Sequence, residues 1–164
     1  MNLNRRLLVR TLDKILVVDD DNELRESIVQ VLENEGYVLD VAKNGYEAEM
    51  KFRNNFYNLA LIDLKLPDIT GIDLLSKINM YTPKTKKIIL TGFPDAETAI
   101  KSVNEKADAY LVKPFNPKKL LEIIAENLEQ QKIELKYTQE KIIEFIRNRI
   151  EELDRSPLPS NLEY

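Results

Sequence analysis

Four apolar runs in this sequence are each followed by polar residues that could do chemistry. These residues are Asp19 and Asp20, Asp63, Thr91 and Lys113. The chain contains no histidine and no cysteine, which excludes disulfides and thiolate catalysis and removes the usual general base and the commonest zinc ligand. Any reaction centre must therefore be built from carboxylates, hydroxyls and lysines.

The chemistry that suits this set is metal-assisted phosphoryl transfer. Carboxylates that converge on one small site repel one another and are normally tolerated when a hard cation neutralises them. Mg²⁺ is the expected cation, because it prefers oxygen ligands and keeps some of its waters. An aspartate can then attack phosphorus, while Lys113 and Thr91 contact the phosphoryl oxygens. A single aspartate after a strand is more often a turn former or an N-cap, so the hypothesis depends on convergence.

The elements that must bring these residues together form an α/β pattern. From Lys14 to about Val112, short apolar runs alternate with helical patterns, which predicts a doubly wound, five-stranded parallel sheet. Near-continuous apolar character is typical of strands buried on both faces. Because ligands bind beyond the carboxyl ends of such strands, the candidate residues are predicted to meet at one edge. The predicted strands are 15–18, 38–41, 59–62, 88–90 and 109–112.

Helices are predicted between these strands from apolar residues spaced three and four apart. The first includes Leu24, Ile28, Val31 and Leu32, and Gly36 stands where a left-handed cap would end it. The three weaker patterns lie at residues 48–52, 72–78 and 96–103.

A long helix is predicted at the end of the chain, with Asn116 as N-cap, Pro117 in the first turn and no break before about Leu153. Its second half exceeds what the sheet can cover and is interpreted as a coiled coil or dimer helix, which suggests a homodimer. The alternative is a fold-back onto the same subunit. The proposed seam comprises Leu121, Ile124, Leu128, Gln131, Leu135, Thr138, Ile142 and Phe145; the fold-back face would use Ile142, Ile143, Ile146, Ile150 and Leu153.

Four segments together resemble the receiver domain of two-component response regulators, with matching order and spacing over roughly Lys14 to Leu128. The resemblance implies a flavodoxin-like sheet of strand order 2-1-3-4-5 and a role in phosphorelay signal transduction. It does not extend to the remainder of the C-terminal helix. The matching segments are Ile15–Asp21, Leu61–Gly71, Ile89–Gly92 and Ala109–Phe115.

The resemblance also implies a role for each matching residue. Asp63 would be the phosphoacceptor, and its phosphorylation would draw Thr91 inward with Tyr110 following, which remodels the face made by the fourth helix, fifth strand and fifth helix. By its own pattern, Tyr110 fits an ordinary strand aromatic equally well. A cis Lys113–Pro114 bond is implied. The implied Mg²⁺ ligands are Asp19, Asp20, Asp63 and the backbone carbonyl of Lys65, and the implied phosphoryl contacts are Thr91 and Lys113.

Two residues depart from the family pattern. Lys106 stands where many receivers have a glycine, and Lys65 places a long cation beside the acceptor. Neither departure removes a catalytic group. We hypothesise that Lys65 alters the lifetime of the phosphoryl group by shielding or steering the attacking water.

The partners follow from the same chemistry. Without a histidine, the chain needs an external sensor histidine kinase or phosphotransfer protein, and its downstream protein target is unknown. A formal charge of −4 and a pI near 5.1 predict no direct nucleic-acid binding.

No apolar run reaches the roughly 18 residues of a membrane span, and the N-terminus lacks a signal-peptide core, so we expect a cytoplasmic protein. The predicted divisions are an N-terminal extension (1–13), a receiver domain (14–128), a C-terminal helical extension (129–155) and a flexible tail (156–164).

Competing interpretations differ in class. A haloacid-dehalogenase-type phosphatase needs Asp-x-Asp-x-Thr/Val, but Glu23 stands at the last position and no acidic pair follows Lys113. An EF-hand fails because Leu24 occupies the glycine position. The complete set of site residues argues against a phosphate-independent interaction module, whereas a receiver fragment of a larger regulator or kinase, with its output domain missing, stays open. The favoured interpretation is a signalling receiver that catalyses only its own phosphorylation and dephosphorylation.

Overall fold

The computed structural model describes residues 12–92 and 107–155. Within these ranges the chain forms a five-stranded, fully parallel sheet of order β2-β1-β3-β4-β5, which confirms the predicted fold class. The predicted helix at 96–103, Lys106, the tail 156–164 and most of the N-terminal extension lie outside the described residues. The strands are β1 (Lys14–Val18), β2 (Val38–Ala42), β3 (Leu59–Asp63), β4 (Lys86–Thr91) and β5 (Ala109–Val112), and the helices are α1 (Asn22–Asn34), α2 (Gly45–Asn54), α3 (Gly71–Asn79) and α5 (Pro117–Arg155).

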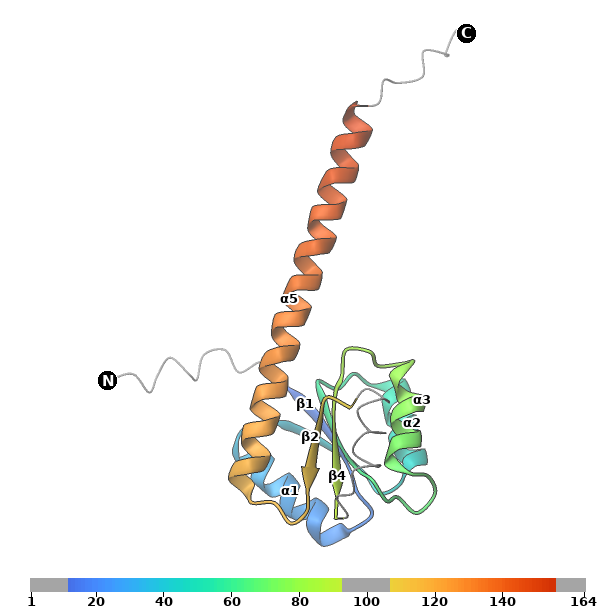
Figure 1. The fold of residues 1–164 in the computed structure, drawn as a ribbon, viewed down its shortest axis with the longest axis vertical. Coiled ribbons are helices and arrows are strands. Elements are labelled where there is room, and N and C mark those ends of the chain that lie inside the picture. Colours follow the sequence, from blue (N-terminus) through green and yellow to red (C-terminus); the bar gives the residue numbers. More distant parts are fainter. Residues whose placement is uncertain (1–11, 93–106, 156–164) are drawn as a thin grey trace, which may run out of the picture. The chain divides into compact units, whose positions relative to one another are not determined.

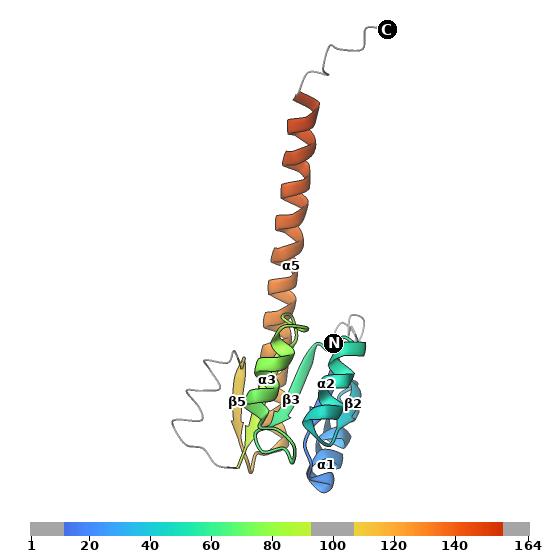
Figure 2. The same ribbon diagram turned by 90° about the vertical axis from the view of Figure 1, so that its right-hand side faces the viewer.

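Helices cover both faces of the sheet (Figures 1 and 2). One apolar cluster joins α2 and α3 to alternate residues of the strands, including Val18, Ile62 and Ile89. The other joins α1 and the first turns of α5 to the intervening strand residues, including Val17 and Leu61. β1, β3 and β4 carry buried side chains on both sides, which explains their nearly continuous apolar sequences.

Local signals define where the helices begin and end. Asp21 accepts a hydrogen bond from the N–H of Leu24 at the start of α1. After α1, Gly36 has a φ of 85°, the left-handed conformation that the sequence predicted for this glycine. Asn116 caps α5 by accepting from the N–H of Lys119 at 2.7 Å. The helices therefore begin at side chains that accept hydrogen bonds from free N–H groups, and α1 is followed by a glycine in the left-handed conformation.

The first turns of α5 pack on the sheet through Leu120, Ile124 and Leu128. Gln131 is also buried, and its side-chain N–H groups donate to the backbone carbonyls of Asn58 at 2.7 Å and Lys84 at 2.6 Å. The chain divides into two compact units directly after this residue. Part of the proposed seam is thus occupied within the first unit, because Ile124, Leu128 and Gln131 face its own sheet.

The second unit contains residues 132–155 of α5 as an uninterrupted helix. The side chains proposed for a fold-back are 51–60% exposed: Ile142, Ile143, Ile146, Ile150 and Leu153. Among the described helices, none is both long and apolar enough to cross a membrane.

Lys87, near the start of β4, is a buried cation at the opposite end of the strand from Thr91. It is 2% exposed, and its amine donates to the backbone carbonyls of Thr82 at 2.7 Å and Thr85 at 2.9 Å. Burial lowers the pKa of this amine to about 8, although the Asp108 carboxylate opposes the shift. The folded protein therefore releases this proton at a lower pH than the unfolded chain, in which the amine has its usual pKa of 10.5.

We predict that the parent protein gains stability relative to a Lys87→Met variant as the pH rises from about 8 to 10.5. In this window the unfolded state binds more protons, so the free energy of unfolding rises with pH. The neutral amine keeps two protons for its two carbonyl acceptors. The expected gain is about 1–3 kcal/mol, measured by urea denaturation at the two ends of the window. A difference between parent and variant that does not change with pH would contradict this account.

Candidate functional site

The predicted site residues converge at the carboxyl ends of the strands. Asp19 follows β1, Asp63 ends β3, Thr91 ends β4 and Lys113 follows β5. The parallel pairing of these strands aligns their ends, with Val18 opposite Ile62 and Asp63 opposite Leu90. One carboxylate oxygen from each of Asp19, Asp20 and Asp63 lies within 4.8 Å of the other two. The three-carboxylate cluster expected from the sequence is therefore present.

Lys113 bridges two members of this cluster. Its ammonium donates to Oδ2 of Asp19 at 2.8 Å and to Oδ1 of Asp63 at 3.0 Å. Its backbone N–H donates to the carbonyl of Thr91 at 2.7 Å, which extends the β4–β5 pairing to this residue. The Lys113–Pro114 bond is cis, as the resemblance implied. The side chain is thus held against both carboxylates by the strand that carries it.

Burial and charge shift the protonation of this pair. Burial raises the pKa of the Asp63 carboxyl, and the negative charges of Asp19 and Asp20 add to the effect while Lys113 opposes it. For Lys113, burial alone would lower the pKa, but hydrogen bonds to Asp19 and Asp63 outweigh it and the pKa is raised. The single positive charge of Lys113 does not neutralise three carboxylates, so the cluster favours binding of an added cation.

Asp19 is fixed by its main chain as well as by Lys113. Its backbone N–H donates to the carbonyl of Ala42 at 3.1 Å, and its Oδ1 accepts from the N–H of Asp21 at 2.9 Å. Arg25, on α1, donates from Nη1 to the Asp19 carbonyl at 2.6 Å. The sequence analysis did not find Arg25, because its place in the first turn of an amphipathic helix carries no signal that its side chain turns back to the end of β1.

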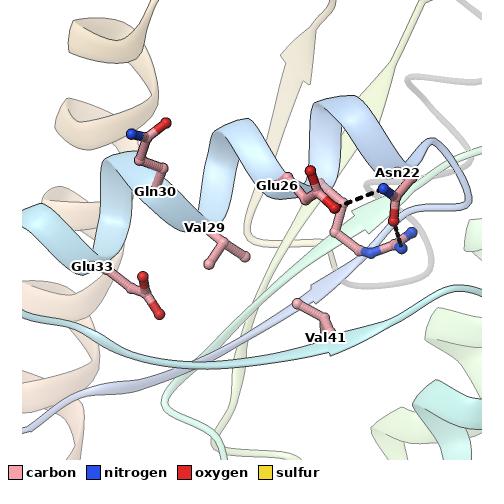
Figure 3. Close-up of a pocket in the computed structure, with 7 residues that line it drawn as sticks. Asn22, Glu26, Val29, Gln30, Glu33 and Val41 are labelled. Carbon is pink, nitrogen blue, oxygen red and sulfur yellow. Dashed lines mark hydrogen bonds between the residues drawn. The ribbon is translucent and has the colours of Figure 1, made fainter.

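A pocket of about 360 Å³ lies next to this arginine, between α1 and β2. Figure 3 shows Glu26, Val29 and Glu33 on α1 facing Val41 on β2, with Asn22 hydrogen-bonded at one end. Asn22 accepts from Nη2 of Arg25 at 2.6 Å and donates to Glu26 at 2.7 Å. None of the clustered aspartates lines this pocket, so it is separate from the acidic site.

The loop after β3 is closely packed beneath the acceptor. The N–H of Leu64 donates to the carbonyl of Leu90 at 2.8 Å, and the N–H of Gly71 donates to the carbonyl of Leu64 at 2.8 Å. A Cβ on Gly71 would clash with the Asp63 carbonyl, so only glycine allows this approach. Lys65 pairs with Thr70 in an isolated antiparallel bridge, and its side chain is exposed. The bridge fixes the backbone of Lys65, which lies two residues after Asp63 in the sequence.

Thr91 and Tyr110 occupy neighbouring strands. Thr91 is 1% exposed at the end of β4, and Tyr110 pairs with Ile89. The Tyr110 ring packs against the cluster under α2 and α3, and its buried hydroxyl has no hydrogen-bond partner in the part of the chain that the structure describes. Tyr110 is therefore an inward-facing aromatic opposite Ile89, two residues before Thr91 at the end of β4.

The donor set fits magnesium. Three carboxylates supply hard oxygen ligands, and two of them are largely buried, Asp19 at 0% and Asp63 at 7% exposure. No thiolate or imidazole is present to favour a softer metal. This acidic cluster is typical of the metal site of receiver domains, and it is consistent with a phospho-accepting site.

Comparison with known proteins identifies the family. The model for the response regulator receiver domain matches residues 15–125, so the chain belongs to this family of two-component signalling modules. The matched domain is a signalling module rather than a catalytic enzyme, and the phosphatase alternative is not supported. A receiver domain in general implies a histidine kinase as partner.

Individual relatives agree with this assignment. A solved CheY-like receiver domain protein from Methanospirillum hungatei JF-1 is 46% identical with a TM-score of 0.74, and the match covers 76% of this chain and 99% of that one. The transcriptional regulatory protein SrrA of Staphylococcus aureus is 34% identical over 110 residues, 66% of this chain and 45% of SrrA. AlgB, an alginate biosynthesis transcriptional regulatory protein of Pseudomonas putida, is 30% identical over 120 residues, 73% of this chain and 27% of AlgB. The chain thus matches less than half of either regulator.

We predict that Asp63→Asn raises the Tm of the protein in the presence of a chelator. The substitution removes one of three crowded negative charges, while the amide oxygen can still accept from Lys113. Adding Mg²⁺ should raise the Tm of the parent and have a smaller effect on the variant. Thermal unfolding followed by circular dichroism measures both quantities.

Asp154→Asn is the matched control, because Asp154 is an exposed aspartate in the second unit. It should leave the Tm and its Mg²⁺ dependence unchanged. A lower Tm for Asp63→Asn in chelator would show that repulsion among the three carboxylates does not destabilise the folded protein.

Proposed function

We propose that Asp63 accepts a phosphoryl group from a sensor histidine kinase or phosphotransfer protein, and that the modified residue switches a protein-interaction surface. The observation that carries this proposal is the position of the Asp63 carboxylate. It lies in a cluster with Asp19 and Asp20, and the Lys113 ammonium is 3.0 Å from its Oδ1. A nucleophilic oxygen, a cation-binding set and a lysine therefore meet at one point.

Each side chain has a defined part in the proposed transfer. An Asp63 oxygen attacks phosphorus, the bond from phosphorus to the donor imidazole breaks, and the imidazole nitrogen keeps that electron pair and takes a proton. Mg²⁺ held by Asp19, Asp20, Asp63 and the backbone carbonyl of Lys65 would neutralise charge on the phosphoryl oxygens. Lys113 needs only to exchange its contact with Asp63 for one with a phosphoryl oxygen. Burial of Asp19 and Asp63 strengthens these interactions by excluding water.

The proposed switch uses Thr91 and Tyr110. The Thr91 hydroxyl would donate to a phosphoryl oxygen, and the Tyr110 ring would respond on the adjacent strand. Within residues 12–92 and 107–155, the buried Tyr110 hydroxyl has no hydrogen-bond partner, which supports a ring position that is sensitive to its surroundings, because an unsatisfied buried hydroxyl is unfavourable. The surface affected would include β5 and α5 together with the predicted helix at 96–103, which lies outside the described residues.

The domain organisation is part of the same proposal. We assign a receiver domain to residues 14–128 and an interaction helix, suited to a homodimer, to residues 129–155. The exposed isoleucines of the second unit support this role. The greater length of SrrA and AlgB supports the further possibility that such a helix links a receiver to an output domain.

The first test is the intact mass of the protein after incubation with acetyl phosphate and Mg²⁺. We expect one added phosphoryl group in the parent, none in Asp63→Asn and none when Mg²⁺ is withheld, because transfer requires both the nucleophile and charge neutralisation. An adduct in Asp63→Asn would move the acceptor elsewhere. If no sample gains a phosphoryl group and beryllofluoride does not bind, the protein acts as a phosphate-independent interaction module.

A second prediction concerns the lifetime of the phosphoryl group. Lys65 has an exposed side chain two residues after Asp63, where its cation can shield the phosphoryl group from water. We expect Lys65→Ala to lose its phosphoryl group roughly threefold faster, about 0.6 kcal/mol on the barrier, measured by mass after removal of the donor. Lys77→Ala, at an exposed lysine of α3, is the control. Equal rates of phosphoryl loss in Lys65→Ala and the parent would contradict this hypothesis.

A further inference from the structure

The loop between β3 and α3 is joined to the start of α2 by one carboxylate. Asp68 accepts from the N–H of Gly45 at 2.8 Å through Oδ1 and from the N–H of Tyr46 at 2.9 Å through Oδ2. Desolvation by its neighbours would raise the pKa of this exposed carboxyl, but the N–H groups of Gly45 and Tyr46 hold the pKa below its usual value. Both oxygens of an exposed aspartate are therefore engaged by a helix that begins 23 residues earlier in the chain.

Helix α2 already has an N-cap of its own. Asn44 accepts from the N–H of Glu47 at 2.8 Å, the usual side-chain cap. Asp68 takes the two N–H groups that Asn44 leaves, those of Gly45 and Tyr46. The two residues thus share the capping of one helix, but only Asp68 belongs to the loop that follows the acceptor strand.

A second contact supports the same junction. Ile69 packs against Gly45 so closely that a Cβ on this glycine would overlap the Ile69 Cγ2 atom. Ile69 and Leu66 also pack against the apolar cluster under α2 and α3. The loop is thus attached to α2 by an apolar contact and by the Asp68 carboxylate.

This attachment bears on the acidic site through Lys65. Lys65 pairs with Thr70 across the loop, and Asp68 lies between them in the sequence. The loop is short, and Gly71 closes it by donating to the carbonyl of Leu64. A shift of Asp68 would therefore move the backbone at Lys65, whose carbonyl is the main-chain ligand in the proposed function.

We propose that Asp68 is a positioning residue that couples the cation site to helix α2 through the β3–α3 loop. This inference rests on the proposed function, because it takes the Lys65 carbonyl as a Mg²⁺ ligand. Because coupling between two sites is reciprocal, α2 holds the loop ready for the cation, and the bound cation stabilises the hydrogen bonds at the start of α2.

The affinity of the full chain for Mg²⁺, measured by calorimetry, tests one direction of this coupling. We expect Asp68→Ala to bind Mg²⁺ about tenfold more weakly than the parent, the lower end for loss of a residue that orients a metal ligand. Asp68→Asn keeps one acceptor and should lie between the two. Asn44→Ala removes a cap from the same helix without touching the loop and should bind Mg²⁺ as the parent does.

Hydrogen exchange at the Gly45 and Tyr46 amides tests the other direction. Mg²⁺ should slow exchange at both amides in the parent and leave it unchanged in Asp68→Ala. Equal Mg²⁺ affinity in Asp68→Ala and the parent, or an equal loss in Asn44→Ala, would overturn the inference and leave the proposed function intact. A parent protein that binds no Mg²⁺ would overturn both.

Discussion

The site depends on one constraint, that three carboxylates occupy a space only a few ångströms across. Lys113 relieves part of this repulsion by binding Asp19 and Asp63 together. Because the lysine supplies a single positive charge, the cluster keeps an excess of negative charge that a hard cation can neutralise. The same lysine stands where a phosphoryl group on Asp63 would add charge. The same few atoms therefore account for the repulsion between the carboxylates, for its neutralisation by Lys113 and for the proposed reaction.

The parallel sheet makes this crowding tolerable. Asp19, Asp63 and Lys113 each continue or end a strand whose preceding residues are packed between two layers of helices. The apolar contacts of those strands hold the polar ends in place, so the unfavourable charge contacts are offset by burial elsewhere. Main-chain contacts add precision, as in the bond from Arg25 to the Asp19 carbonyl and in the close approach of Gly71 to β3.

The two units of the chain differ in what stabilises them. The first has a continuous core that reaches Gln131, where a polar side chain satisfies the backbone carbonyls of Asn58 and Lys84. The second is a helix whose larger apolar residues, except the partly buried Leu135, are more than half exposed. Single exposed apolar residues need no explanation, but a stripe of isoleucines along one helix is typical of a surface that contacts another protein.

The sequence by itself determined the strand runs, the caps of α1 and α5 and the residue types that follow each strand, because these depend on local backbone geometry and on apolar periodicity. It also carried enough motif information to indicate the family. Only the tertiary structure decided that Lys113 bonds both Asp19 and Asp63, that Arg25 reaches the Asp19 carbonyl and that Asp68 caps α2. It also decided that Ile124, Leu128 and Gln131 pack within the first unit instead of lining a free seam. These contacts join residues that are distant in sequence or on unmarked helix faces, and their partners are set by how the layers pack, which no local pattern records.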